Sequence, residues 1–412
     1  MSMTNAAALA TSPSIVSERI QRIKLSPSVA VRTIIAQLRE QGRRIIDLTI
    51  GEPDFSTPEH ICAAATAAMA RGETKYPASQ GTPALRKAVA ARMQADWGVS
   101  YPVGQIIVST GAKQVIYNAL AATLNEGDEV IIPAPFWVSY PDMVVVNGGT
   151  PVIANATPEQ GYKLTPEALE RAITPRTKWL MMNSPSNPTG ALYTREDLEG
   201  LCAVLLRNPH VWLMTDDIYA RLNFTGSPTV HPIQVAPALA ARTLLVNGVS
   251  KAYAMTGWRI GFGAGPEPLI QAMAVLQSQS TSGASSISQA AALEALTGPQ
   301  DCVQQFAATF RERRDVAVRL MAGIDGLKVV VPEGAFYVFP DCNGLMGKTT
   351  PTGEVLRTDT DLTNYLLREA GVALIDGTAY GAPGTFRLSF AASMDAIAQG
   401  CEGIRAACAK LI

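Results

Sequence analysis

Short apolar runs recur along the middle of the chain, and longer stretches of mixed apolar and polar residues separate them. Seven runs stand out, at residues 106–109, 130–133, 151–154, 179–182, 211–215, 243–246 and 259–262. Short strands without polar alternation are typical of a parallel sheet that is buried on both faces, and the stretches between them leave room for crossover helices. The pattern predicts an α/β fold in which helices cover both faces of a mostly parallel, seven-stranded sheet.

Two of the intervening helices have readable starts. Thr165 precedes a proline and a glutamate, which is the order expected of an N-cap followed by a first turn. Thr194 and Asp197 have the spacing of a capping box. Both segments are therefore predicted to begin helices between strands.

The pattern changes after residue 285. A helical stretch at 285–296 and a long one at 300–321 lead into further apolar runs at 328–331, 335–339, 372–375 and 385–390. This predicts a second, smaller α/β unit. We expect an N-terminal arm at 1–58 that also contributes to the small domain, a large domain at 59–305 and the rest of the small domain at 306–412, since 412 residues exceed one typical core.

Composition narrows the classes of function. The net charge of −1 offers no basic face for nucleic acid or anionic lipid, and no apolar stretch is long enough for a membrane span. The N-terminus has no basic segment before an apolar one, so we expect a cytoplasmic protein. Three histidines and six scattered cysteines predict no metal site.

Lys251 lies just beyond an apolar run, in a loop of small residues with Arg259 eight positions further on. This placement fits an amine held in a pocket better than a solvated charge. Because desolvation lowers the proton affinity of an amine, Lys251 is a candidate for imine formation with an aldehyde.

Polar or aromatic residues also follow three other predicted strands. Asp216 ends one strand, Asn187 lies in the turn-rich loop after another, and Trp137 follows a third. The carboxyl ends of such strands are where open α/β sheets bind ligands. Each residue also has an ordinary alternative, namely a helix cap, a plain turn and a core tryptophan.

Two further features suit anionic groups. Gly111 and Ala112 lie where a strand gives way to a helix, and the free N–H groups of such a turn suit a phosphate, although a plain turn is as good an interpretation. Arg387 lies within a strand pattern, where it binds a ligand carboxylate or forms a structural ion pair.

Together these residues form a specific set. From about residue 18 to the C-terminus the chain resembles the fold-type I pyridoxal-phosphate aminotransferases of class I/II, and within them the bacterial aspartate aminotransferase branch that also includes prephenate aminotransferases. The resemblance is carried, in this order, by the motifs GEPDF, TGAKQ, NPTG, DDIY, SKAYAMTGWRIG, GAFYVF and FRLSFA.

The resemblance implies roles around pyridoxal 5′-phosphate. Lys251 would form the imine with the cofactor and later carry a proton for the substrate. Asp216 would keep the pyridine nitrogen protonated, and Tyr219 and Asn187 would hydrogen-bond the phenolic oxygen. Trp137 would stack on the ring.

The resemblance also implies the residues that hold the cofactor phosphate. They are Gly111, Ala112, Ser250 and Arg259 of one chain and Tyr76 of the neighbouring subunit. The role of Tyr76 implies a homodimer with shared active sites.

The same comparison implies how substrate binds. Arg387 and the backbone at Gly51 would hold the α-carboxylate, next to Trp137 and Asn187, and Lys113 would meet the distal carboxylate of a dicarboxylic substrate.

The chain departs from the branch at a few positions. Phe136 stands where relatives often have tyrosine, Ser28 where they have threonine, and Arg32 is unusual for the branch. Ser28 and Arg32 could therefore redirect the choice of substrate side chain.

We accordingly expect ping-pong transfer of an amino group from L-aspartate to 2-oxoglutarate, giving oxaloacetate and L-glutamate. An aromatic or prephenate aminotransferase is the nearest alternative. Alternatives of other classes are a pyridoxal-phosphate lyase or decarboxylase on the same fold, and a non-catalytic ligand-binding protein.

Overall fold

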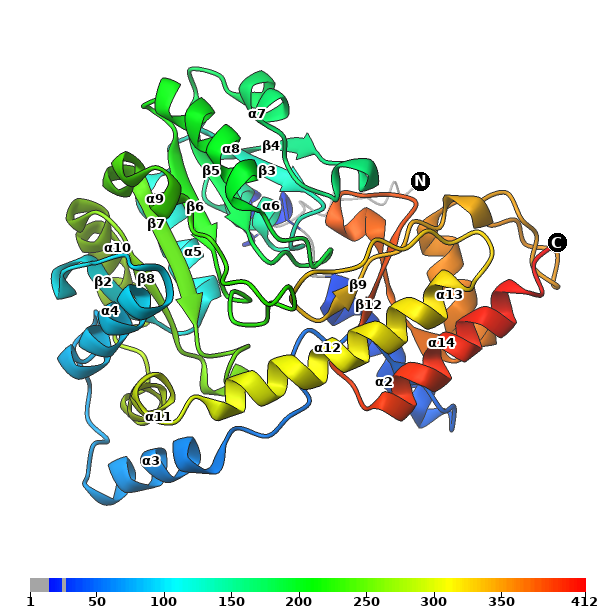
Figure 1. Cartoon of the computed structure of the whole chain (residues 1–412), viewed down its shortest axis with the longest axis horizontal. Coiled ribbons are helices and arrows are strands. Elements are labelled where there is room, and N and C mark those ends of the chain that lie inside the picture. The colour runs from blue at the N-terminus through cyan, green and yellow to red at the C-terminus, as the bar shows by residue number, and fades with distance from the viewer. Residues whose placement is uncertain (1–14, 24–26) are drawn as a thin grey trace, which may run out of the picture.

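A seven-stranded sheet forms the centre of the larger part of the molecule (Figure 1). The structure is a computed structural model and describes residues 15–23 and 27–412. The strands are mutually parallel except for β8, which runs antiparallel to both neighbours. In spatial order they are β2 (Ile106–Ser109), β8 (Gly261–Ala264), β7 (Thr243–Gly248), β6 (Trp212–Asp216), β5 (Thr177–Asn183), β3 (Glu129–Ala134) and β4 (Thr150–Asn155).

Alternate residues of the strands enter different cores, so both faces of the sheet are buried. In β3, Val130 and Ile132 pack into one cluster and Ile131 into another. In β7, Leu244 and Leu245 divide in the same way. The helices of this part of the molecule are α3 (Glu59–Ala70), which packs on α11, and α4 (Pro83–Trp97), α5 (Ala112–Thr123), α6 (Tyr140–Val146), α7 (Pro166–Ala172), α8 (Arg195–Arg207), α9 (Pro232–Val235), α10 (Glu267–Ser280) and α11 (Ser286–Thr297). The predicted α/β class and the mostly parallel seven-stranded sheet are confirmed.

The two predicted helix caps are confirmed. Thr165 accepts a hydrogen bond from the backbone N–H of Ala168 at the start of α7. Thr194 and Asp197 form the capping box of α8. The last predicted strand, at 259–262, is wrong by two residues, because Arg259 has a left-handed φ of 56° and ends a short 3-10 helix before β8 begins.

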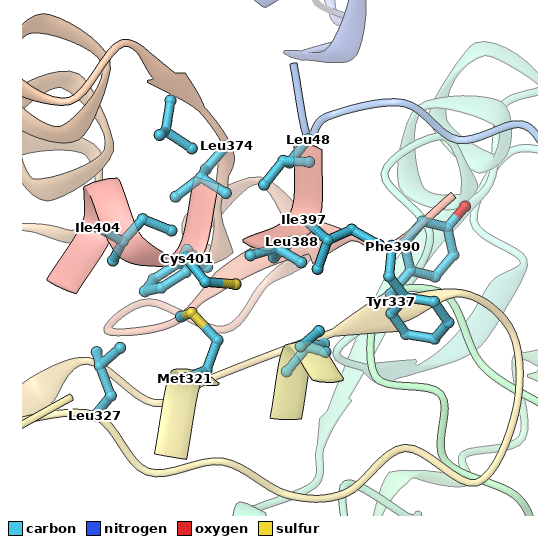
Figure 2. Packing of buried hydrophobic residues seen from close by; sticks show 14 of the residues in the cluster. Leu48, Met321, Leu327, Tyr337, Leu374, Leu388, Phe390, Ile397, Cys401 and Ile404 are labelled. Carbon is cyan, nitrogen blue, oxygen red and sulfur yellow. The ribbon is translucent and has the colours of Figure 1, made fainter. Parts of the chain in front are cut away.

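The smaller unit surrounds a three-stranded antiparallel sheet in the order β11 (Ile375–Asp376), β12 (Phe386–Ser389), β9 (Tyr337–Val338). Its helices are α12 (Asp301–Ala322), α13 (Asp359–Glu369) and α14 (Met394–Cys408). Figure 2 shows the apolar core between them, where Met321 of α12 and Cys401 of α14 lie close to Leu388 of β12. The long helix α12, yellow in Figure 1, extends from the larger part of the molecule into this unit.

Three strand predictions in this unit are corrected. Residues 328–331 form no strand, and only Lys328 makes an isolated bridge, to Asp341. The run at 335–339 contributes only the two residues of β9, since Ala335 has a positive φ of 57° that a strand does not accept. The run at 372–375 divides into β10 (Val372–Ala373) and β11.

The N-terminal segment packs on the smaller unit. After α1 (Glu18–Gln21) and α2 (Pro27–Glu40), β1 (Ile46–Asp47) pairs with β10 in parallel, and Leu48 enters the core shown in Figure 2. The domain boundaries at 58 and 305 stay a prediction. No helix of the described residues is long and apolar enough to cross a membrane, and the cytoplasmic location stays a prediction as well.

Candidate active site

The carboxyl ends of the strands in the large sheet open onto one cavity of about 410 Å³. Ten side chains or backbone segments named from the sequence line it together: Gly51, Ala112, Lys113, Trp137, Asn187, Asp216, Tyr219, Ser250, Lys251 and Arg259. Arg387, which comes from β12 of the smaller unit, completes the wall. The cavity therefore lies where the two parts of the molecule meet.

Lys251 follows β7 directly and reaches across the cavity. Its Nζ donates a 2.5 Å hydrogen bond to the carbonyl oxygen of Gly51, and it lies 5.8 Å from the centre of the Tyr219 ring. Removal from water lowers the pKa of Lys251 from 10.5 to about 8, and the nearby Arg387 and Arg259 act in the same direction. A substantial fraction of this amine is consequently neutral near physiological pH, as nucleophilic attack on an aldehyde requires.

Asp216 is the last residue of β6, and its side chain is buried. Burial raises the pKa of Asp216 to about 6, whereas a 2.6 Å hydrogen bond from the hydroxyl of Tyr140 to its Oδ2 opposes that rise. Among the described residues, its Oδ1 accepts only a long 3.4 Å contact from the backbone N–H of Ile218. One carboxylate oxygen therefore keeps acceptor capacity for a ligand.

Tyr219 and Asn187 each form one side-chain hydrogen bond in the cavity wall and can still donate another. The hydroxyls of Tyr219 and Tyr337 are 2.9 Å apart, and burial raises the pKa of Tyr219 well above 10, so this phenol stays protonated and can donate. Asn187 accepts a 3.0 Å hydrogen bond from Nη1 of Arg387 through its Oδ1. Its amide nitrogen has no partner among the described residues and remains able to donate.

The turn before α5 forms a close cradle with Arg259. Gly111 has a φ of +87°, and a Cβ at this position would lie 2.6 Å from Nη2 of Arg259. The first N–H groups of α5 are unpaired within the helix and carry the positive end of its dipole. Ala112, Ser250 and Arg259 line the same cavity, so this arrangement can hold a phosphate.

Arg387 is 3% exposed, yet no carboxylate of the described residues forms an ion pair with it. Its Nη2 donates to the carbonyl oxygen of Thr49 at 2.6 Å, and its guanidinium lies 4.4 Å from the centre of the Tyr337 ring. Its Nε is buried and has no partner among those residues. A buried guanidinium with unused donors is suited to a carboxylate that arrives with a ligand.

Lys113 lies in the first turn of α5 and lines the cavity. Its Nζ donates to the hydroxyl of Ser139 at 3.1 Å and lies 4.6 Å from the centre of the Trp137 ring. Desolvation and, second, the charge of Arg259 lower the pKa of Lys113. No acidic side chain of the described chain segments pairs with it.

Several residues named from the sequence lie elsewhere. Tyr76 is 96% exposed and does not reach the cavity of its own chain. Phe136 packs against Gly381 of the smaller unit instead of lining the cavity. The backbones of Ser28 and Arg32 belong to α2, but their side chains are outside the described part of the structure, so their predicted effect on specificity stays untested.

Sequence reasoning missed Tyr140, Tyr337 and the pair Glu52 and Thr256, all of which line the cavity. Thr256 donates a 2.7 Å hydrogen bond to the Glu52 carboxylate. Tyr337, Glu52 and Thr256 lie inside motifs that carry the family resemblance, so their position in these motifs could have identified them as site residues. Tyr140 carried none, because only the turn of the chain into α6 brings it beside Asp216.

A parallel sheet with a reactive amine, an anion-binding turn and a buried guanidinium at one edge defines an α/β enzyme that holds a phosphorylated group beside a carboxylate ligand. A comparison with family models gives the family. The model of the aminotransferases of class I and II matches residues 43–404, and the chain belongs to this family.

Individual relatives cover nearly the whole chain. An aspartate aminotransferase of Rhizobium meliloti is 50% identical over 393 residues, which are 95% of this chain and 96% of the relative. An aspartate/prephenate aminotransferase of Cereibacter sphaeroides is 51% identical over 395 residues, 96% of this chain and 99% of the relative. The expectation of a class I/II aminotransferase is confirmed.

Solved structures agree with the sequence relatives. The aspartate aminotransferase of Rhizobium meliloti superposes with a TM-score of 0.95 at 50% identity, covering 96% of this chain and 99% of that one. The Thermus thermophilus enzyme with maleate gives a TM-score of 0.88 at 42% identity, covering 95% and 99%. The chain therefore has the fold of these aminotransferases.

The cofactor of this family is pyridoxal 5′-phosphate, and the residues present fit it. The Gly111 turn leaves no room for a side chain beside Arg259, Asp216 keeps an acceptor at Oδ1, and Lys251 offers an amine of lowered pKa. An enzyme that transfers amino groups acts on amino acids and 2-oxo acids, as expected from the sequence.

Proposed function

We propose that this aminotransferase moves an amino group from L-aspartate to 2-oxoglutarate in a ping-pong reaction. The observation that carries the proposal is Lys113, an ammonium held over the Trp137 ring without a carboxylate partner in the described part of the chain. Arg387 and Lys113 thus present two cations on one cavity, which suits a substrate with two carboxylates. The names of the two sequence relatives support a dicarboxylic substrate, and so does the maleate that accompanies the Thermus thermophilus enzyme.

When bound, pyridoxal phosphate supplies an aldehyde for the substrate amine and an electron-withdrawing ring that stabilises negative charge at the α-carbon. Lys251 would hold the cofactor through Nζ, and the same amine would be the base that accepts the proton from the substrate α-carbon. Its pKa of about 8 suits a base that works near neutrality. Asp216 would keep the ring nitrogen protonated through Oδ1.

The other residues bind and orient. Asn187 and Tyr219 would donate to the phenolic oxygen of the ring, and Trp137 would pack against the ring. Gly111, Ala112, Ser250 and Arg259 would hold the phosphate. Arg387 fixes the α-carboxylate, and the carbonyl oxygen of Gly51, which accepts from Lys251 here, positions the amine beside it.

We also propose a homodimer in which the partner subunit's Tyr76 reaches the phosphate. The exposure of this tyrosine at 96% supports the proposal, because a phenol that its own chain leaves in solvent is available to a second copy. Light scattering should give twice the chain mass of 43.7 kDa. A monomer with full activity would contradict the proposal.

Steady-state kinetics with a panel of amino donors test the substrate. kcat/KM for aspartate should exceed that for phenylalanine, tyrosine and alanine. In Lys113→Met the value for aspartate should fall about 30-fold or more, by loss of a charge-assisted contact, while that for phenylalanine changes little. A value for aspartate no better than for the aromatic donors would sink the assignment.

Prephenate is the second candidate, because one of the relatives that are about half identical is named an aspartate/prephenate aminotransferase. Glutamate should then be consumed with prephenate as acceptor at a kcat/KM comparable to that with oxaloacetate. No turnover with prephenate would restrict the enzyme to the aspartate reaction.

A further inference from the structure

Tyr140 is the one fully buried phenol that contacts a proposed cofactor-binding carboxylate in the described chain. It is 3% exposed, opens α6, and donates its hydroxyl proton to Oδ2 of Asp216 at 2.6 Å. The Trp137 ring packs against it edge-on, with 5.3 Å between ring centres. In this packing the hydroxyl has Asp216 as its hydrogen-bond acceptor.

The direction of this hydrogen bond is fixed. Burial and the negative charge of Asp216 raise the pKa of Tyr140 well above 10, so the phenol keeps its proton at any working pH. An ionised carboxylate can only accept. Tyr140 therefore favours the charged form of Asp216.

The other surroundings of Asp216 favour its neutral form. Burial disfavours its charge, and so does Asp217 next to it, whereas the contact from the Ile218 N–H is long and the positive charge of Lys251 is a weaker influence. Tyr219 lies close enough for the charge of Asp216 to raise its pKa, and it is itself neutral. Among the groups that face Asp216, Tyr140 is the strongest that favours ionisation.

We propose that Tyr140 is a positioning residue that occupies Oδ2 of Asp216, keeps this side chain ionised and leaves Oδ1 for the protonated ring nitrogen of the cofactor. The inference rests on the proposed role of Asp216 toward that nitrogen. It adds a residue whose effect passes through the carboxylate and not through direct contact with the reacting atoms.

The test uses pyridoxamine 5′-phosphate, which lacks the aldehyde and so reports non-covalent binding alone. Calorimetry with the cofactor-free protein at a series of pH values should show affinity falling on the acid side as Asp216 takes up a proton. In Tyr140→Phe this fall in affinity, the acid limb of the profile, should begin about one pH unit higher, with about fivefold weaker binding at pH 6, because a donor to the charged form is lost. At pH 8 the two proteins should bind more nearly alike.

Tyr162→Phe is the matched control. Tyr162 is also a buried tyrosine, it packs edge-on against Phe339, and its hydroxyl has no partner among the described residues. Removing this hydroxyl should leave the acid limb where it is in the unchanged protein. An equal displacement in both variants would overturn the inference.

A double variant separates positioning from general packing. In the Asp216→Asn background no carboxylate titrates, and Tyr140→Phe should weaken binding by less than about twofold further. If Tyr140→Phe does not fold, fluorotyrosine introduced at position 140 keeps the shape, donates more strongly and should move the acid limb downward. An unmoved limb in either protein overturns the inference.

Failure of the inference and failure of the proposed function give different results. A protein that does not bind pyridoxamine phosphate at any pH contradicts the proposed function, and the inference with it. Binding that Asp216→Asn weakens strongly but Tyr140→Phe leaves unaltered at every pH overturns only the role of Tyr140.

Discussion

Two buried arginines, one on α12 and one on β12, differ in whether the protein supplies a carboxylate partner. Arg313 of α12 is 9% exposed and binds Asp54 through both terminal nitrogens, at 2.6 and 3.0 Å. Arg387 of β12 is 3% exposed and has no carboxylate partner in the described chain. Because an unpaired buried charge is costly, the missing partner supports the proposed role of Arg387 in binding a ligand carboxylate.

One short segment connects both regions. The carbonyl oxygens of Thr49 and Gly51 accept from Arg387 and Lys251, and a few residues later Asp54 holds Arg313. Phe55 stacks on Phe306 of α12 with 4.3 Å between ring centres. The structural arginine thus fixes the segment against which the cavity is built.

The largest effect is expected from Arg387→Met. kcat/KM for aspartate should fall about 100- to 1,000-fold, since the substrate α-carboxylate loses a two-point, charge-assisted contact. The melting temperature should stay the same or rise, because no ion pair within the protein is broken. Parallel kinetics and thermal denaturation measure both.

Arg387→Lys is its control, because it keeps the charge but not the planar fork, and should give an intermediate loss. A variant at position 387 that melts well below the unchanged protein, with activity retained, would make Arg387 a structural residue like Arg313.

Arg313→Met should show the reverse behaviour. Breaking the pair leaves Asp54 without its cation, and the free energy of unfolding should fall by about 2 kcal/mol, less than for a fully buried pair because Asp54 is partly exposed. kcat/KM should fall by no more than about tenfold, through the displaced segment. Urea denaturation is the measurement, and the double variant Asp54→Asn/Arg313→Met should lose less than the sum of the single changes.

The smallest effect concerns pH and separates Lys251 from solvated lysines. Since its pKa in the folded protein, about 8, is below that of the unfolded chain, its charge destabilises the cofactor-free protein fully below pH 8 and not at all above about 10.5. Cofactor-free Lys251→Met should therefore melt a few degrees higher than the unchanged protein at pH 7. The difference should shrink as the pH rises from 8 to 10.5.

Lys87→Met, at a position on the outer part of α4, provides the comparison and should show no such trend. A Lys251→Met protein with the same pH trend as Lys87→Met would show that the amine is not held away from water.

The sequence predicted the large sheet better than the small one. Strands such as β6 and β7 each contain three successive apolar residues because both their faces are buried, and this leaves a clear pattern. β9 and β11 have two residues each, too few for any periodicity, and their places depend on long-range pairing with β12. The false strand at 328–331 shows that an apolar run alone does not supply a pairing partner.

The candidate site could likewise be predicted only in part. Lys251, Asp216 and Asn187 lie at or soon after the ends of sheet strands, so their convergence was predictable from the chain. The partners that tune them were not, because Tyr140 reaches Asp216 across 76 positions and Tyr337 reaches Tyr219 across 118. Contacts of this kind are set by tertiary packing, which no local pattern records.

The most direct test of transamination is a single half-reaction of the cofactor-loaded enzyme with L-aspartate and no 2-oxo acid. We predict one equivalent each of oxaloacetate and pyridoxamine phosphate per active site, after which the reaction stops until 2-oxoglutarate is added. Continued consumption of aspartate without an acceptor, or release of carbon dioxide or ammonia without pyridoxamine phosphate, would contradict transamination and indicate a decarboxylase or lyase.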